Sequence, residues 1–122
     1  MIKEQFYKNK ISWQKSFMSG FCVDDQDNEV PWMTYPMIEF LKTTITKNHE
    51  VFEFGCGAST LFFARNAKNV TSIETNKIWQ NIVTTKLAES ELKNSQIFLA
   101  WVTVALCQHL RLGQRLESKL LY

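Results

Sequence analysis

Long apolar runs, a strong charge of either sign and a dense set of cysteines are all missing from this sequence. No apolar stretch approaches the ~20 residues that a membrane-spanning helix needs, so no membrane span is expected. The charged beginning of the chain is not followed by an apolar segment, and no secretory signal is therefore expected. The formal charge of +2 is too small to indicate a nucleic-acid partner or an anionic membrane surface.

The cysteines Cys22, Cys56 and Cys107 are odd in number and widely spaced. They suggest neither a metal-ligand pair nor a disulfide framework, so we expect no metal site and a reducing, cytoplasmic location. The acidic run at residues 24–29 has some likeness to a calcium loop. It lacks the central glycine and the terminal glutamate at the required spacing, and a solvated loop is the favoured interpretation.

The stretch VFEFGCGAST, residues 51–60, has the pattern of a buried strand, a tight turn and the start of a helix. Gly55 allows the chain to turn without a clash at Cβ. Gly57 allows backbone amides to approach a ligand closely. Ser59 or Thr60 is expected to cap the following helix, whose free N–H groups would face the same place. Such a turn is typical of nucleotide-binding folds.

Two carboxylates are placed near this turn. Glu53 precedes it by two residues, and Glu74 follows the next predicted strand, 21 residues after Glu53. That is the position of the acid that binds ribose hydroxyls after a nucleotide-binding turn. The alternatives are a surface residue at a strand end for Glu74, and for Glu53 a structural charge satisfied by loop amides. A dinucleotide fingerprint is disfavoured, because Thr60 stands where it requires glycine or alanine.

Strands and helices alternate along the chain, which predicts a parallel sheet with right-handed crossovers. The fold class is therefore α/β, a Rossmann-like doubly wound parallel sheet with about three strands and with helices on both faces. A helix-like spacing of Trp13, Phe17 and Phe21 indicates a short helix that packs on this core. The later elements are expected as helices at 36–47, 59–67 and from 77 onward, and as strands at 51–54, 70–73 and 97–102.

Thr75 or Asn76 can cap the helix that follows. The spacing of its apolar residues predicts one buried face. An i,i+4 pair of Glu89 and Lys93 is expected on its other side. The residues predicted to be buried are Ile78, Trp79, Ile82, Val83 and Leu87.

Three segments together resemble a bacterial branch of the class I S-adenosylmethionine-dependent methyltransferases. They are PWMTYP at 31–36, IEFL at 38–41 and FEFGCGAST at 52–60, and the resemblance covers roughly residues 12–100. It implies S-adenosylmethionine as cofactor and a small-molecule or glycan-related methyl acceptor. It also implies that Glu53 orients the turn and the cofactor's amino group. The cofactor-binding residues that it implies are Glu53, Gly55, Cys56, Gly57, Ser59 and Glu74.

The resemblance divides the chain into an N-terminal extension at 1–30, the first half of a methyltransferase domain at 31–102 and a tail at 103–122. Residues 101–116 contain no acidic residue, and the Asp-Gly dipeptide expected in this branch is absent. Residues 106–116 instead have the pattern of a basic amphipathic helix. We therefore expect a chain truncated or frame-shifted after about Ala100, with no identified catalytic residue and no activity as written. The alternative function is a non-catalytic remnant that retains part of a nucleoside-binding cleft.

Overall fold

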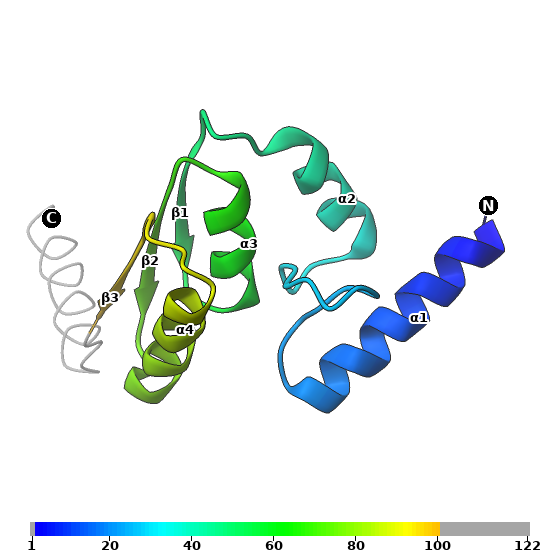
Figure 1. Cartoon of the computed structure of the whole chain (residues 1–122), viewed down its shortest axis with the longest axis horizontal. Coiled ribbons are helices and arrows are strands. Elements are labelled where there is room, and N and C mark those ends of the chain that lie inside the picture. Colours follow the sequence, from blue (N-terminus) through cyan, green and yellow to red (C-terminus); the bar gives the residue numbers. More distant parts are fainter. Residues whose placement is uncertain (1, 101–122) are drawn as a thin grey trace, which may run out of the picture.

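The computed structural model describes residues 2–100, which form four helices and three strands. Figure 1 shows their arrangement. In chain order the elements are α1 (Ile2–Ser19), α2 (Tyr35–Thr44), β1 (Glu50–Phe54), α3 (Ala58–Asn66), β2 (Asn69–Glu74), α4 (Lys77–Glu89) and β3 (Ser95–Leu99). The predicted helix at 106–116 and the tail at 103–122 lie outside the described residues.

The strands form one parallel sheet in the order β1-β2-β3. Glu53 is the register partner of Ser72, and Glu74 is the partner of Leu99. The carboxyl ends of all three strands therefore meet at one edge of the sheet. This arrangement confirms the predicted α/β, Rossmann-like fold class.

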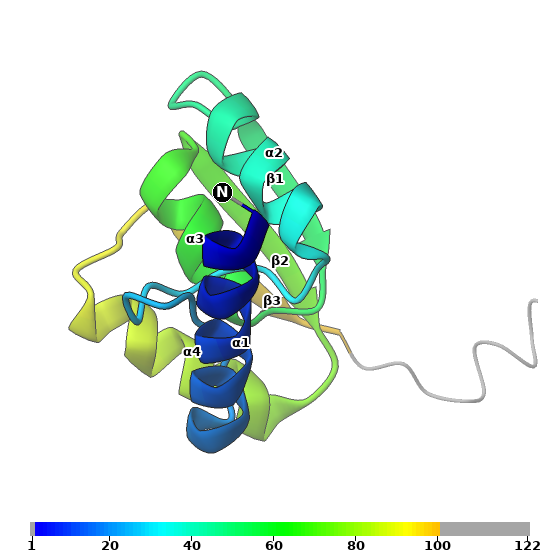
Figure 2. The same cartoon turned by 90° about the vertical axis from the view of Figure 1, so that its right-hand side faces the viewer.

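The described helices lie on one face of the sheet, not on both faces as expected (Figures 1 and 2). The physical reason is the strand order. Successive right-handed crossovers that advance in one direction place α3 and α4 on the same side. Burial agrees with this, because Val70 and Ser72 on the helix side of β2 are almost fully buried, whereas Phe52 and Phe98 on the opposite side are 55% and 54% exposed.

Helix α3 is the centre of the core. It lies against β2 and α4, and it consists mostly of buried residues because other elements cover it on several sides (Figure 1). The core residues are Phe21, Cys56, Ala58, Leu61, Phe62, Phe63, Ala64, Val70, Val83 and Leu87.

Four helical expectations differ from the structure. The expected short helix through Trp13, Phe17 and Phe21 is the 18-residue α1, which ends at Ser19 and leaves Phe21 outside it. Helix α2 ends at Thr44 rather than near residue 47. The β-branched residues at 43–46 disfavour further helix. In α4 only Val83 and Leu87 are fully buried, while Ile78 and Ile82 are 73% and 41% exposed. The helix ends at Glu89, so Lys93 lies beyond it and the predicted i,i+4 pair was wrong.

The cap of α4 agrees with the predicted position, and α2 begins within one residue of the predicted start. Asn76 caps α4, and its side chain accepts a hydrogen bond from the Trp79 N–H at 3.0 Å. Thr34 occupies the cap position of α2 and Pro36 its first turn, but the Thr34 side chain makes no capping bond. Both helices therefore begin where the sequence signals place them.

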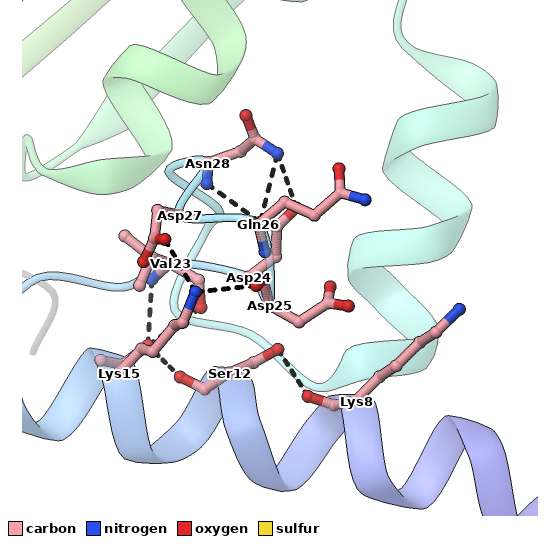
Figure 3. A network of polar contacts seen from close by, with 10 residues as sticks. Lys8, Ser12, Lys15, Val23, Asp24, Asp25, Gln26, Asp27 and Asn28 are labelled. Atoms are coloured by element: carbon pink, nitrogen blue, oxygen red, sulfur yellow. Dashed lines mark hydrogen bonds and ion pairs between the residues drawn. The ribbon is translucent and has the colours of Figure 1, made fainter.

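The acidic loop at 24–29 closes on itself and is attached to α1 (Figure 3). Asp24 Oδ1 accepts bonds from the Gln26 and Asn28 N–H groups, both at 2.9 Å. Lys15 on α1 donates to the Asp27 carboxylate at 2.7 Å. Within residues 2–100, no group of three or more histidine, cysteine or acidic side chains is placed to hold a metal ion, and no helix is long and apolar enough to cross a membrane.

Candidate nucleotide site at the carboxyl ends of β1 and β2

The turn between β1 and α3 has the geometry that its glycines predict. Gly55 has a φ of +83°, a conformation that side chains with a Cβ rarely adopt. Its N–H donates to the Ile73 carbonyl at 2.7 Å, which ties the turn to β2. Gly57 is extended and occupies the cap position of α3.

No crowding within the protein requires glycine at Gly57. A Cβ added there would meet the Trp79 ring at 3.8 Å, which is ordinary van der Waals contact. Gly57 also lines a cavity, so a ligand in that cavity can approach this backbone. The first-turn amides of α3 adjoin it, and a helix leaves such amides without a partner of its own.

Of the two residues expected to cap α3, Ser59 and Thr60, only Thr60 takes part in the cap. The Gly57 N–H donates to the Thr60 hydroxyl at 3.0 Å, so Thr60 reaches back from the third helical position. Ser59 lies within the helix, and its hydroxyl donates to Glu53 at 2.7 Å. Ser59 does not cap the helix, because α3 begins at Ala58 and the cap position falls on Gly57, whereas the Thr60 hydroxyl does bond to the cap residue.

Glu53 is the centre of a network of hydroxyl groups. Its carboxylate accepts bonds from Ser59 and from Ser72, each at 2.7 Å, and a further bond from Thr60. It thus joins β1, the start of α3 and β2. The structural alternative considered for Glu53 named loop amides as its partners; in the structure the partners are hydroxyls.

Glu74 holds the turn through the backbone. Its Oε1 accepts the N–H groups of Thr75 at 2.7 Å and Asn76 at 2.8 Å, and its Oε2 accepts the Cys56 N–H at 3.1 Å. The residue is only 8% exposed. Burial has the largest single effect and raises the pKa of this carboxyl, but the hydrogen bonds, three of them from backbone amides, together lower it further, so the pKa lies below its ordinary value.

A carboxylate has about four acceptor positions. Both positions on Glu74 Oε1 are filled by amides, and on Oε2 the Cys56 N–H leaves one position, which the Cys56 thiol approaches at 3.6 Å. The contact to two ribose hydroxyls that the sequence suggested therefore has to accommodate these bonds. As the side chain stands, a ribose hydroxyl can bind to Oε2 only in place of the weak bond from the Cys56 thiol.

Cys56 is buried and faces Glu74. Burial and the nearby Glu74 carboxylate raise the pKa of its thiol to about 12. A helix N-terminus ordinarily lowers the pKa of a nearby thiol, but here desolvation and a negative neighbour outweigh that effect. Cys56 is therefore a neutral, unreactive part of the turn, and its carbonyl accepts the Trp79 indole N–H at 2.6 Å.

Sequence reasoning anticipated Thr60 as a capping residue but missed its bond to Glu53, and it missed the roles of Ser72 and Trp79 at this site. Thr60 and Ser72 are fully buried polar residues, and both serve Glu53. The pairing of Glu53 with Ser72 depends on the strand register, for which residues 51–73 carry no local signal. Trp79 was assigned to a buried helix face, and its bond to the turn appears only once α4 is placed beside it.

A cavity of about 720 Å³ lies next to the turn. One side is formed by Cys56, Gly57, Ala58 and Ser59, and the others by α1 and the segment that precedes α2. Its volume falls within the ~300–1,000 Å³ range of small-molecule sites.

No family model matches the chain, and no curated protein matches it. Among solved structures, an rRNA methylase from Streptococcus thermophilus is similar, with a TM-score of 0.48 and 18% sequence identity. The match covers 57% of this chain and 45% of that protein. The chain thus spans less than half of the length of the structure that it matches.

Proposed function

We propose that this chain forms the cofactor-binding part of an S-adenosylmethionine-dependent methyltransferase. The observation that carries the proposal is the glycine turn at the carboxyl end of β1, together with the buried Glu74 at the end of β2. Ligands of open α/β sheets bind outside the carboxyl ends of the strands. The resemblance of residues 31–60 to this methyltransferase branch indicates which nucleoside cofactor binds, namely S-adenosylmethionine.

The residues at this edge fit a nucleoside cofactor with an amino-acid tail. Glu74 Oε2 can accept one ribose hydroxyl in place of the weak bond from the Cys56 thiol. The open backbone at Gly57 admits a close approach, and the first-turn amides of α3 can donate to a carboxylate. Glu53 acts through the turn, because Ser59 and Thr60 hold its oxygens toward α3. When bound, the cofactor supplies an electrophilic methyl group.

Methyl transfer needs alignment of a nucleophile and, for many acceptors, a base. Cys56 is the cysteine of the turn, and with its pKa at about 12 it does not serve as a nucleophile or base near neutral pH. The proposal therefore assigns cofactor binding to residues 2–100 and names no catalytic group among them.

The test is calorimetric titration of the full chain with S-adenosylhomocysteine. Gly57→Ala is the sharpest variant, because the added Cβ meets no protein atom closer than 3.8 Å but occupies the space proposed for the ligand. We expect Gly57→Ala to weaken binding at least tenfold while the unfolding transition stays near that of the wild type.

Glu74→Ala should also weaken binding, since one hydrogen bond to a charged group contributes about 1.5–3 kcal/mol, or roughly ten- to a hundredfold in affinity. Equal affinity in the wild type and both variants would refute the assignment. Binding without turnover of labelled S-adenosylmethionine on a pool of acceptors would favour the alternative, a non-catalytic nucleoside-binding remnant.

A further inference from the structure

The cavity beside the turn has an aromatic side that the proposed function does not use. Trp13 and Phe17 on α1 stack with ring centroids 5.8 Å apart and an interplanar angle of 17°. Trp32 and Met33 contribute from the segment before α2. We call these four residues, three aromatic side chains and the Met33 thioether, the aromatic wall.

The aromatic wall is exposed to a degree that is unusual for large apolar side chains. Trp13 is 63% exposed, Phe17 78% and Trp32 92%. A contiguous apolar surface of this kind next to a cavity marks a binding site more often than a scattered exposed residue does. The wall is thus a candidate for ligand contact.

The wall is held in place by bonds behind it. The Tyr35 hydroxyl donates to the Asn9 carbonyl of α1 at 2.8 Å, and Ser16 of α1 accepts the Val23 N–H at 2.9 Å. Lys15 adds its bonds to the acidic loop (Figure 3). These contacts fix α1 relative to residues 23–35, so the two sides of the cavity are preformed.

None of the described residues that line the cavity carries a formal charge. They are Trp13, Ser16, Phe17, Gly20, Phe21, Cys22, Val23, Val30, Pro31, Trp32, Met33, Tyr35, Ile38, Cys56, Gly57, Ala58, Ser59 and Trp79. A charged group on the α1 side of the cavity would have no charged side chain as a partner, which is costly, whereas the first-turn amides of α3 on the other side remain the proposed contact for the carboxylate of the cofactor. The part of a ligand that lies against the aromatic wall is therefore neutral.

The hydroxyl protons of Ser16, Tyr35 and Ser59 are already donated to protein oxygens. Ser59 donates to Glu53, Tyr35 donates to Asn9, and Ser16 donates to backbone carbonyls on α1 and at Val23. A sugar ring would leave several of its own hydroxyls without partners, which is unfavourable. The lining therefore favours an aromatic ring over a glycan.

We propose that this cavity binds a neutral aromatic ring of the methyl acceptor, stacked on the aromatic wall. The proposal rests on the proposed function, because only the adjacent turn makes this ligand an acceptor. It narrows the acceptor from a small-molecule or glycan-related compound to an uncharged aromatic one. The ring would lie against Trp13 and Phe17, with its edge toward the first turn of α3.

The test uses 2-naphthol as an uncharged aromatic probe, methyl β-D-glucopyranoside as a sugar probe and S-adenosylhomocysteine as the cofactor probe. Binding of each to the full chain is measured by calorimetry at neutral pH. Trp13→Ala and Trp32→Ala remove parts of the wall. Phe54→Ala is the matched control, because Phe54 is an aromatic residue that is 87% exposed on the opposite face of the sheet.

We expect 2-naphthol to bind the wild type and to lose about tenfold in affinity in each tryptophan variant, as stacking energies imply. Phe54→Ala should leave this affinity unchanged, and the tryptophan variants should keep the wild-type affinity for S-adenosylhomocysteine. Binding of the sugar without 2-naphthol would overturn the inference. So would an equal loss in Phe54→Ala, or a parallel loss of S-adenosylhomocysteine affinity, which would assign the wall to the cofactor.

The two proposals fail separately. If the wild type does not bind S-adenosylhomocysteine, the proposed function fails whatever the naphthol result. If it binds S-adenosylhomocysteine but not 2-naphthol, the cofactor site stands and the acceptor inference fails.

Discussion

Replacement of Glu74 by glutamine tests whether this carboxylate holds the turn together. The change is nearly isosteric, but the amide keeps one acceptor oxygen and gains an NH2 group. In the most favourable orientation the oxygen retains the shorter bonds to Thr75 and Asn76. The NH2 group then faces the Cys56 N–H, so a donor meets a donor.

The loss can be estimated from the bonds. One charged hydrogen bond disappears, and two others become neutral, which together should lower the free energy of unfolding by about 2–4 kcal/mol. Domains of this kind are stable by only about 5–15 kcal/mol. With a urea slope of about 1–3 kcal/mol per molar, we expect the unfolding midpoint of Glu74→Gln to fall by about 1 M or more.

The assay is urea unfolding of the full chain followed by far-ultraviolet circular dichroism. Glu50→Gln is the control, because Glu50 forms an exposed pair with Lys68 at 3.1 Å, and exposed pairs contribute little to stability. A midpoint for Glu74→Gln that equals the midpoint for Glu50→Gln would show that Glu74 does not hold the turn.

Three further predictions concern the same edge of the sheet. The pKa of Glu74 is lowered in the folded protein, so its stabilising effect is present above about pH 4.5 and disappears as the pH falls through the folded-state pKa. Acid titrations should show this loss of stability in the wild type and not in Glu74→Gln. Gly55→Ala should destabilise the protein by about 1–2 kcal/mol, because φ is positive there, and thermal unfolding that matches the wild type would contradict this. Cys56 should react slowly with a disulfide reagent at pH 8, since the pKa of its thiol is about 12, and mass spectrometry of the labelled chain should show rapid labelling of Cys56 only after unfolding.

Much of the fold follows from local sequence signals. Gly55 and Gly57 marked the turn, Asn76 marked the start of α4, and the β-branched run at 70–73 marked β2. Each signal acts within a few residues, through backbone conformation or capping bonds. For that reason the positions of the turn, the strands and the starts of α2, α3 and α4 agree with prediction to within a few residues, whereas α1 begins well before the expected short helix.

Burial depended on neighbours that local patterns do not specify. Ile78 and Phe17 have helical spacing typical of a core face, but both are largely exposed, because no described element covers them. The expectation of helices on both faces failed for a similar reason. It depends on the direction in which strands are added to the sheet, and alternation of strands and helices leaves that direction open.

The sequence by itself determined the candidate site residues and their order along the chain: Glu53, the two glycines and Glu74. Only the tertiary structure decided what their side chains do. Parallel pairing of β1 with β2 places Ser72 beside Glu53 and Glu74 beside Cys56. The two residues of the first contact are 19 positions apart in the chain, and those of the second are 18 apart. Local propensity fixes the conformation of a turn, whereas hydrogen-bond partners and pKa shifts arise from groups that meet only after the strands have paired.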